Sequence, residues 1–224
     1  NAALDKQKNV LLAAGLASED ESLGTDEVAV RFAAITQRVI SVSTGRVVEG
    51  IDPVTFDQRA ASIDPARSQP APDNAARVVR IPTEALVYEM RDDAGRLEMV
   101  VLPIEGLGLW GTLYGFIALD GDVRTIRGLT FYEHKETPGL GGEVDNPRWK
   151  ALWTGRLAFD DDLTPAIGVV KGPAGSVTEA PYGVDGLSGA TITSRGVTNL
   201  LRFWLGPDGL GSYLTRLRGE GVSD

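Results

Sequence analysis

Two pairs of apolar, β-rich segments, each joined by a short polar turn, limit most strongly how this chain can fold. "ALVYEM" (85–90) and "LEMVVLPI" (97–104) flank the turn "DDAG", and "LWGTLYGFIALD" (109–120) and "VRTIRGLTFYEH" (123–134) flank "GD". Turns this short join antiparallel neighbours. A further β-rich run, "TPAIGVVKG" (164–172), follows. We predict that these segments form one mostly antiparallel central sheet.

Segments with helical periodicity lie on both sides of this region. The predicted helices cover residues 4–16, residues 25–39 with Val28, Phe32, Ile35 and Val39 on one face, residues 189–205, and residues 212–218. Residues 41–48 read as a strand, and the proline-rich residues 53–76 as a surface loop within one domain. The order of helices, strands and helices predicts an α+β fold, with residues 1–224 as a single domain and helices packed around the sheet.

Composition excludes several classes of function. The net charge of −9 argues against nucleic acid or an anionic membrane surface as the main partner. The absence of cysteine and the single histidine exclude thiolate chemistry and metal sites built on cysteine or on two imidazoles, so no metal is expected. The chain contains no run of about 18 apolar residues, which is the length needed to span a bilayer. Because the chain opens at Asn1 rather than Met, we expect that an N-terminal segment, which could be a membrane anchor, precedes it.

The segment "ETPGLGGEVDNP", from Glu136 to Pro147, is unusually rich in glycine and proline. Such a loop has a fixed shape and exposed backbone N–H groups, so it can wrap a flat or anionic ligand. An ordinary connection between a strand and a helix would explain the composition equally well.

The segment "DGLSGATITS", Asp185 to Ser194, leads directly into the amphipathic helix predicted at 189–205. A helix N-terminus offers unpaired N–H groups and the positive end of the helix dipole, which together stabilise a phosphate. Simple helix capping by Ser188 or Thr191 is the alternative. Capping needs one hydroxyl, whereas Ser188, Thr191, Thr193 and Ser194 supply four, which favours a phosphate site.

Other constellations carry less weight. A catalytic triad would have to use His134, the only imidazole, with Ser188 or Thr191. Glu133 and Glu136 could form a carboxylate pair, although charged strand ends are common. Trp110 begins a strand interrupted by glycine, where a flat ligand could stack on its ring.

The threonine-containing segment resembles a flavinylation motif in which FMN is esterified through its phosphate to a threonine. The pattern is an aspartate, two residues, Ser or Thr, Gly, Ala, Thr, one residue, and then Thr or Ser followed by Ser. It is met by Asp185, Ser188, Gly189, Ala190, Thr191, Thr193 and Ser194. The threonine after Gly-Ala is the modified residue in this motif, which corresponds to Thr191.

Longer segments narrow the resemblance. "LDKQKNVLLAAGL", "GLGLWGTLYGFIAL", "TFYEHKETPGLGGEVDNPRW", "VKG" and "RFWLGPDGLGSYLTRLR" resemble the C subunit of the sodium-translocating NADH:quinone oxidoreductase. The related subunit of the Rnf-type ferredoxin:NAD oxidoreductase shares the threonine motif, but "LDKQ" and "FWLG" favour the former. A module that binds a phosphorylated ligand without a covalent bond and a hydrolase with a threonine or serine nucleophile remain alternatives.

This resemblance implies an electron-relay subunit of a sodium-pumping membrane complex in the bacterial inner membrane. It implies one N-terminal transmembrane helix, missing from this chain, followed by the FMN-carrying domain in the periplasm. The other subunits of the complex are the implied partners, and a separate flavin transferase is implied to attach FMN to Thr191.

The resemblance also implies roles for individual residues. The phosphate would lie at the helix N-terminus formed by Ala190–Ser194, hydrogen-bonded by Ser188 and the backbone N–H groups, with Gly189 and Thr193 also in the binding site. Glu136, Thr137, Gly139 and Leu140 would contact the isoalloxazine ring, with Trp110 on its other side. Lys171 is a candidate cation near the phosphate or the ring, where it would stabilise a reduced flavin. Asp185 belongs to the motif and would order the loop or be read by the transferase.

Overall fold

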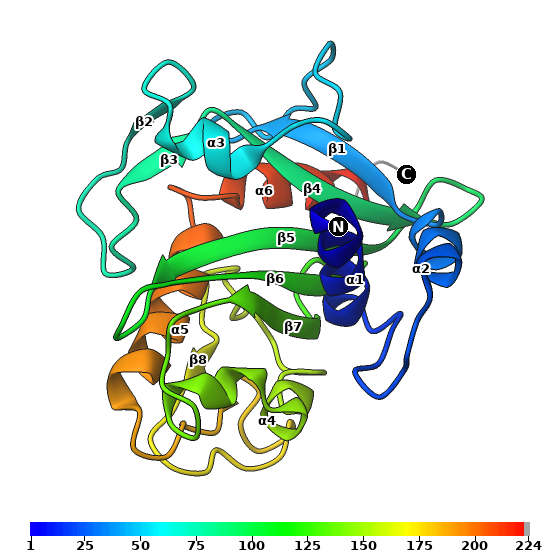
Figure 1. Cartoon of the computed structure of the whole chain (residues 1–224). Helices are drawn as coiled ribbons and strands as arrows, with labels where there is room; N and C mark the ends of the chain where they lie inside the picture. Colours follow the sequence, from blue (N-terminus) through cyan, green and yellow to red (C-terminus); the bar gives the residue numbers. More distant parts are fainter. Residues whose placement is uncertain (222–224) are drawn as a thin grey trace.

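A five-stranded antiparallel sheet forms the centre of the protein (Figure 1). The computed structural model describes residues 1–221. The strand order is β1-β4-β5-β6-β7, and every neighbouring pair is antiparallel. The strands are β1 (Thr36–Ser41), β4 (Glu84–Arg91), β5 (Leu97–Leu107), β6 (Thr112–Asp120) and β7 (Ile126–Glu133). Strands β4 to β7 form a continuous meander, so both predicted hairpins are confirmed.

The hairpin turns are stabilised by aspartates that accept backbone hydrogen bonds. In the β4–β5 turn, Asp92 Oδ1 accepts hydrogen bonds from the amides of Ala94 and Arg96, and Gly95 adopts φ +81°. In the β6–β7 turn, Asp122 Oδ1 accepts them from Arg124 and Thr125. A short side chain that reproduces a backbone turn explains why these "DD" and "GD" sequences end one strand and start the next.

Helices cover both faces of the sheet. The helices are α1 (Ala2–Ala13), α2 (Thr25–Phe32), α3 (Gln58–Ile63), α4 (Pro147–Ala151), α5 (Thr191–Trp204) and α6 (Gly211–Glu220), with a 3₁₀ turn η1 (Gly141–Asp145). One hydrophobic core joins α1, α2 and Ala61 of α3 to Leu86, Tyr88, Val101 and Phe116 of the sheet. The other joins Trp149 of α4, α5 and α6 to Val87, Leu102, Ile117 and Phe131 on the opposite face. The prediction of an α+β fold with a mostly antiparallel sheet is confirmed.

The predicted helix over residues 25–39 is wrong in its second half. Helix α2 ends at Phe32, and β1 begins at Thr36. Ile35 and Val39 are buried, as the helical pattern required, but Val39 is buried by strand pairing with Leu86. Of the predicted strand at residues 41–48, only Ser41 belongs to a strand, as the last residue of β1, and the rest forms a turn closed by one antiparallel bridge between Ile40 and Val47. The boundary between α2 and β1 is set by the pairing of β1 with β4, which the helical spacing of apolar residues in the sequence does not reveal.

The β-rich run at 164–172 does not join the central sheet, contrary to our prediction. Only β8 (Gly168–Val169) is a strand, and it pairs in parallel with β9 (Gly183–Val184). This small ladder lies against α5, where Thr198 Oγ1 accepts a hydrogen bond from the amide of Val169 at 2.9 Å. The predicted loop at 53–76 contains α3 and β2 (Ser68–Pro70), which pairs with β3 (Arg80–Pro82).

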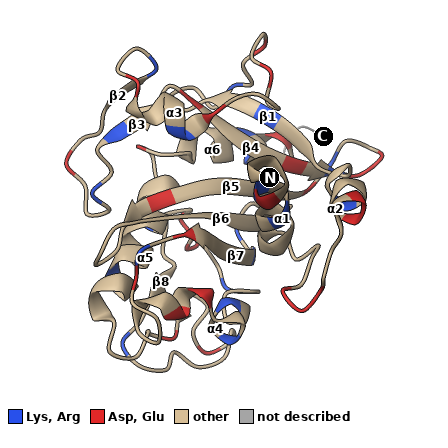
Figure 2. Cartoon of the chain, in the orientation of Figure 1, with Lys and Arg blue, Asp and Glu red and all other residues tan. Residues whose placement is uncertain are grey.

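The positions of charged residues lie mainly in the turns and on the outer helices, and the inner strands carry few of them (Figure 2). Within residues 1–221, no helix is both long enough and apolar enough to cross a membrane.

Candidate functional site at the start of helix α5

Helix α5 begins at Thr191 without a side-chain cap. Ala190 is the N-cap residue, and no side chain accepts a hydrogen bond from the first-turn amides. The side chains of Thr191 and Ser188 are exposed and have no hydrogen-bond partner among the described residues. Capping by Ser188 or Thr191, the alternative considered from the sequence, is therefore not observed. The helix N-terminus presents free N–H groups and two free hydroxyls, which together suit an anion.

The other two hydroxyls of the segment are used inside the protein. Thr193 Oγ1 donates a hydrogen bond to Glu136 Oε1 at 2.8 Å, and Ser194 Oγ donates to the carbonyl of Ala190 at 3.0 Å. Both side chains are buried. The sequence-based expectation that all four hydroxyls could serve one phosphate is wrong, because only those of Ser188 and Thr191 are available to a ligand.

A buried carboxylate ties the segments around this helix start together. Glu136 is 5% exposed. In addition to Thr193, its Oε1 accepts the amide of Leu109 at 2.7 Å, and its Oε2 accepts the amide of Trp110 at 2.9 Å. Three donors thus compensate the burial of one charge. The carboxylate of Glu136 binds within the protein and fixes the positions of its neighbours.

The glycine-rich loop packs directly on the first turn of α5. A Cβ atom at Gly141 would lie 2.5 Å from Thr193 Oγ1, so only glycine allows this approach. A Cβ at Gly189, which has φ +68°, would lie 3.1 Å from Leu140 Cδ2. The structure therefore brings the two motifs of the sequence, residues 136–147 and 185–194, into contact.

Exposed apolar side chains lie on the first turn of α5 and on the segments that are joined to it through Glu136 and Gly189. Trp110 is 65% exposed, and Leu109, Leu140 and Ile192 are each about half exposed. Thr137 and Gly139 lie exposed in the same loop as Leu140. We call Leu109, Trp110, Leu140 and Ile192 the apolar rim. An isolated exposed apolar residue needs no explanation, but several at one helix start indicate a surface that another apolar group covers.

Asp185 orders the loop that follows β8. Its Oδ1 accepts the amide of Ala174 at 2.9 Å, and its carbonyl accepts Trp149 Nε1 at 2.9 Å. The adjacent Gly186 donates its amide to the carbonyl of Gly172. Lys171 lies in this loop and is exposed, and among the described residues no hydrogen bond or ion pair joins it to the start of α5. Asp185 thus has a structural role. Lys171 lies in the loop that Asp185 orders and makes no contact with the start of α5.

The carboxylate pair and the triad considered from the sequence are not formed. Glu133 is exposed and pairs with Arg59 at 3.0 Å, away from the donors of Glu136. His134 Nδ1 accepts the amide of Glu136, so its Nε2–H donates to Asp145 Oδ2 at 2.7 Å. The histidine braces the glycine-rich loop, and neither Ser188 nor Thr191 contacts it.

Sequence reasoning missed Leu109 and Ile192. Ile192 follows Thr191 but falls outside the core face defined by Val197, Leu200 and Leu201, and it is exposed. An isoleucine on the polar face of an amphipathic helix was the available signal.

Comparison with known proteins supplies the family. Residues 108–206, which include both motifs, match the family described as FMN-binding domain. The chain is 45% identical over 221 residues to the C subunit of the Na⁺-translocating NADH-quinone reductase of Pseudomonas aeruginosa, covering 97% of this chain and 84% of that protein. The corresponding protein of Yersinia pestis is 44% identical over 219 residues, covering 96% and 80%. The chain belongs to the family of C subunits of the Na⁺-translocating NADH-quinone reductase.

Solved structures of the same family agree. The crystal structure of Shewanella oneidensis NqrC superposes with a TM-score of 0.87 at 36% identity, covering 98% of this chain and 100% of that one. The corresponding crystal structure from Parabacteroides distasonis gives 0.72 at 28% identity, covering 96% and 94%. The resemblance stated from the sequence is confirmed. As a member of this family, the chain is an FMN-binding part of a membrane-associated oxidoreductase, with the other subunits as its partners.

Proposed function

We propose that this domain carries FMN as a phosphoester on Thr191 and relays electrons between other subunits of the complex. The observation that carries the proposal is the exposed, unpartnered hydroxyl of Thr191 at the uncapped start of α5. A covalent attachment residue must be accessible to a modifying enzyme, and Thr191 meets this requirement whereas the buried Thr193 does not.

The helix start suits the phosphate of FMN. The first-turn amides of α5 and the hydroxyl of Ser188 are free to donate hydrogen bonds to phosphate oxygens. The helix dipole adds about 0.3–1 kcal/mol for an anion at this end. Gly189 and Ala190 place no side chain larger than a methyl group between Ser188 and Thr191.

The apolar rim suits the isoalloxazine ring. Leu140 already contacts the backbone position of Gly189, so a ring leaving Thr191 meets Leu140 first. Thr137, Gly139 and Trp110 complete our set of ring contacts, and Lys171 supplies a cation on the β8 side. Bound FMN supplies one- and two-electron transfer. The protein's own residues orient the ring, shield one face from water and hold the phosphate in place.

We further propose that a separate flavin transferase makes this bond, and that Asp185 presents the loop to it in a fixed shape. The domain would then act at the periplasmic side of the bacterial inner membrane, held there by an N-terminal transmembrane helix outside residues 1–224.

The Thr191→Val variant tests the attachment site. Co-expressed with the transferase, the wild-type chain should gain the mass of one FMN less one water and fluoresce on a denaturing gel. Thr191→Val should show neither signal. Because Thr191 makes no cap hydrogen bond, the variant should fold with a stability within about 0.5 kcal/mol of wild type.

Ser188→Ala is the matched control, because it removes the other exposed hydroxyl and leaves Thr191 intact. It should retain covalent flavin. A mass-shifted, fluorescent Thr191→Val protein would show that another hydroxyl is modified and would refute the proposal.

A further inference from the structure

A groove of about 540 Å³ crosses the face of the sheet that α1 and α3 leave uncovered. Residues of β4, β5, β6 and β7 line the groove, together with residues of α1 and α3. Trp204 is the one α5 residue that lines it, at the opposite end of the helix from Thr191. At 1.5 Å per residue, the two helix ends are about 20 Å apart. The groove is therefore separate from the flavin site.

Aromatic side chains form the floor of the groove. The rings of Tyr114 and Tyr132 are stacked with centroids 6.4 Å apart, and Phe116 lies 5.3 Å from Tyr132. Tyr88 meets Phe116 edge to face at 5.8 Å. Tyr88 and Phe116 are buried and Arg59 lies over Tyr114, so Tyr132, which is 40% exposed, is the ring of this set on which another planar ring can stack.

The charged groups of the groove favour a ligand that is not an anion. Acidic side chains outnumber basic ones in the lining: Asp5, Asp57 and Glu105 against Lys6 and Arg59. Arg59 is already engaged, since its guanidinium lies 3.7 Å from the centroid of Tyr114 and pairs with Glu133. The main basic group beside the aromatic floor is thus unavailable to a phosphate or carboxylate.

Besides the buried hydroxyl of Tyr88, which has no hydrogen-bond partner among the described residues, the groove holds the carboxyl group of Glu105. Among the described residues its carboxylate has no hydrogen-bond partner. Burial raises the pKa of Glu105 above its ordinary value, although the charge of Arg59 acts in the opposite direction. A carboxyl group that is partly withdrawn from water and lacks a donor gains free energy when a ligand supplies one.

We propose that this groove binds an uncharged planar aromatic molecule of one or two fused rings that carries a hydrogen-bond donor. The ring stacks on the exposed ring of Tyr132, because Arg59 already lies over Tyr114, and the donor reaches the carboxylate of Glu105. The volume falls within the range of about 300–1,000 Å³ that is usual for small-molecule sites. Nothing in this proposal depends on the attachment of FMN to Thr191.

Binding of 2-naphthol to the whole chain, followed by its fluorescence and by NMR shifts of groove residues, tests the proposal. Wild-type protein should bind it saturably. Tyr132→Leu should weaken binding by about threefold to tenfold, because the stacking partner is lost. Tyr182→Leu, which removes a half-buried tyrosine outside the groove, is the matched control and should bind as wild type does.

Two further arms keep the test independent of any folding defect in Tyr132→Leu. Ala3→Trp places a large side chain at an exposed position on the groove wall and should abolish binding. Wild type should prefer 2-naphthol over 2-methoxynaphthalene, which has no donor, by about fivefold or more. Glu105→Leu should remove that preference. Non-saturable binding, equal weakening by Tyr182→Leu, or a preference that survives in Glu105→Leu would overturn the proposal.

Discussion

Glu136 shows how one buried side chain can organise a site without facing the ligand. Its two oxygens accept three hydrogen bonds, from Thr193 of α5 and from the amides of Leu109 and Trp110. The backbone amide of the same residue is held by His134. A glutamate at position 136 therefore matters because its contacts hold Trp110 and the loop of Leu140 against the first turn of α5.

Glu136→Gln should loosen this arrangement. The amide replaces one acceptor oxygen with an NH₂ group that faces an N–H donor, so a buried donor loses its partner at a cost of about 2 kcal/mol. Denaturant unfolding should show this loss, and the emission of attached flavin should change. Glu133→Gln, the same substitution three positions away in an exposed ion pair, should cost less than about 1 kcal/mol. Equal effects of the two substitutions would contradict this role for Glu136.

Leu140→Ala and Trp110→Ala should alter the flavin without preventing its attachment. Both truncations remove apolar surface from the rim, so water reaches the ring more easily and both its fluorescence and its reduction potential should shift. Covalent yield should be unchanged, because Thr191 and Ser188 are untouched. Val79→Ala removes an exposed apolar side chain outside the rim and serves as control. Unaltered fluorescence and potential in both rim variants would place the ring elsewhere.

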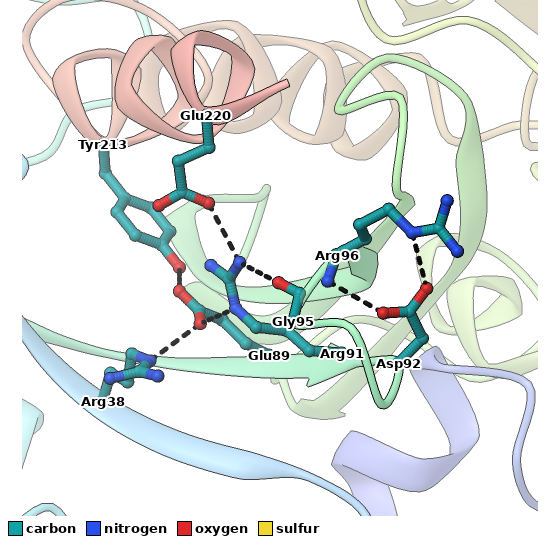
Figure 3. A network of polar contacts seen from close by, with 8 residues as sticks. All are labelled: Arg38, Glu89, Arg91, Asp92, Gly95, Arg96, Tyr213 and Glu220. Carbon is teal, nitrogen blue, oxygen red and sulfur yellow. Dashed lines mark hydrogen bonds and ion pairs between the residues drawn. The ribbon is translucent and has the colours of Figure 1, made fainter. Parts of the chain in front are cut away.

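At the scale of elements, α6 is joined to the sheet by a network of buried charge (Figure 3). Glu89 of β4 is 2% exposed, accepts a hydrogen bond from the hydroxyl of Tyr213, and pairs with Arg38 at 2.7 Å and Arg91 at 3.0 Å. Arg91 continues to Glu220 at the end of α6. These contacts connect β1, β4 and α6 across the edge of the sheet.

The stability supplied by Glu89 should depend on pH. Burial alone would raise the pKa of Glu89, but the hydrogen bonds from Tyr213 and Arg91 outweigh it, so the pKa lies below its ordinary value of 4.5. The ionised form therefore stabilises the fold above pH 4.5 and loses this effect as the pH falls through the folded pKa.

Glu89→Gln should cost about 3 kcal/mol at pH 7, because it leaves two arginines without their buried partner. The difference in free energy of unfolding between wild type and variant should shrink below about pH 4.5. Glu220→Gln, which changes an exposed partner of Arg91, should cost less than about 1 kcal/mol. A difference that stays constant from pH 7 to pH 3 would refute the assignment.

At the scale of the whole molecule, the two hydrophobic cores share one sheet. Val101 and Leu102 are consecutive residues of β5, yet their side chains enter opposite cores. Loss of packing on one face therefore disturbs the strand that supports the other, which argues for one cooperative unit.

We expect a single unfolding transition for the domain. Leu102→Ala should lower stability by about 2–5 kcal/mol through the cavity it leaves. Near-UV and far-UV circular dichroism should nevertheless report coincident transitions in wild type and variant. Val101→Ala in the other core is the matched variant and should likewise keep the two probes together. Separate transitions for the two probes would show that the cores unfold as independent units.

The features determined by the sequence alone are those that depend on near neighbours. Hairpins β4–β5 and β6–β7 follow from alternating apolar residues and from turns in which an aspartate accepts hydrogen bonds from its own loop. The start of α5 and the residues that resemble a flavinylation motif lie within one short segment. Local periodicity and short-range hydrogen bonds act within such segments, which is why the order of residues was enough to predict them.

Tertiary structure decided the features that need distant segments. Pairing with β4 converted residues 36–41 into a strand, and docking on α5 separated β8 from the central sheet. The hydrogen bond from Thr193 to Glu136 joins positions 57 residues apart, and it makes the Thr193 hydroxyl unavailable to a ligand. The groove is assembled from α1, α3, the last residue of α5 and four strands of the sheet. Burial and hydrogen-bond partners are properties of neighbours in space, and no local pattern in the chain encodes which distant residues those neighbours will be.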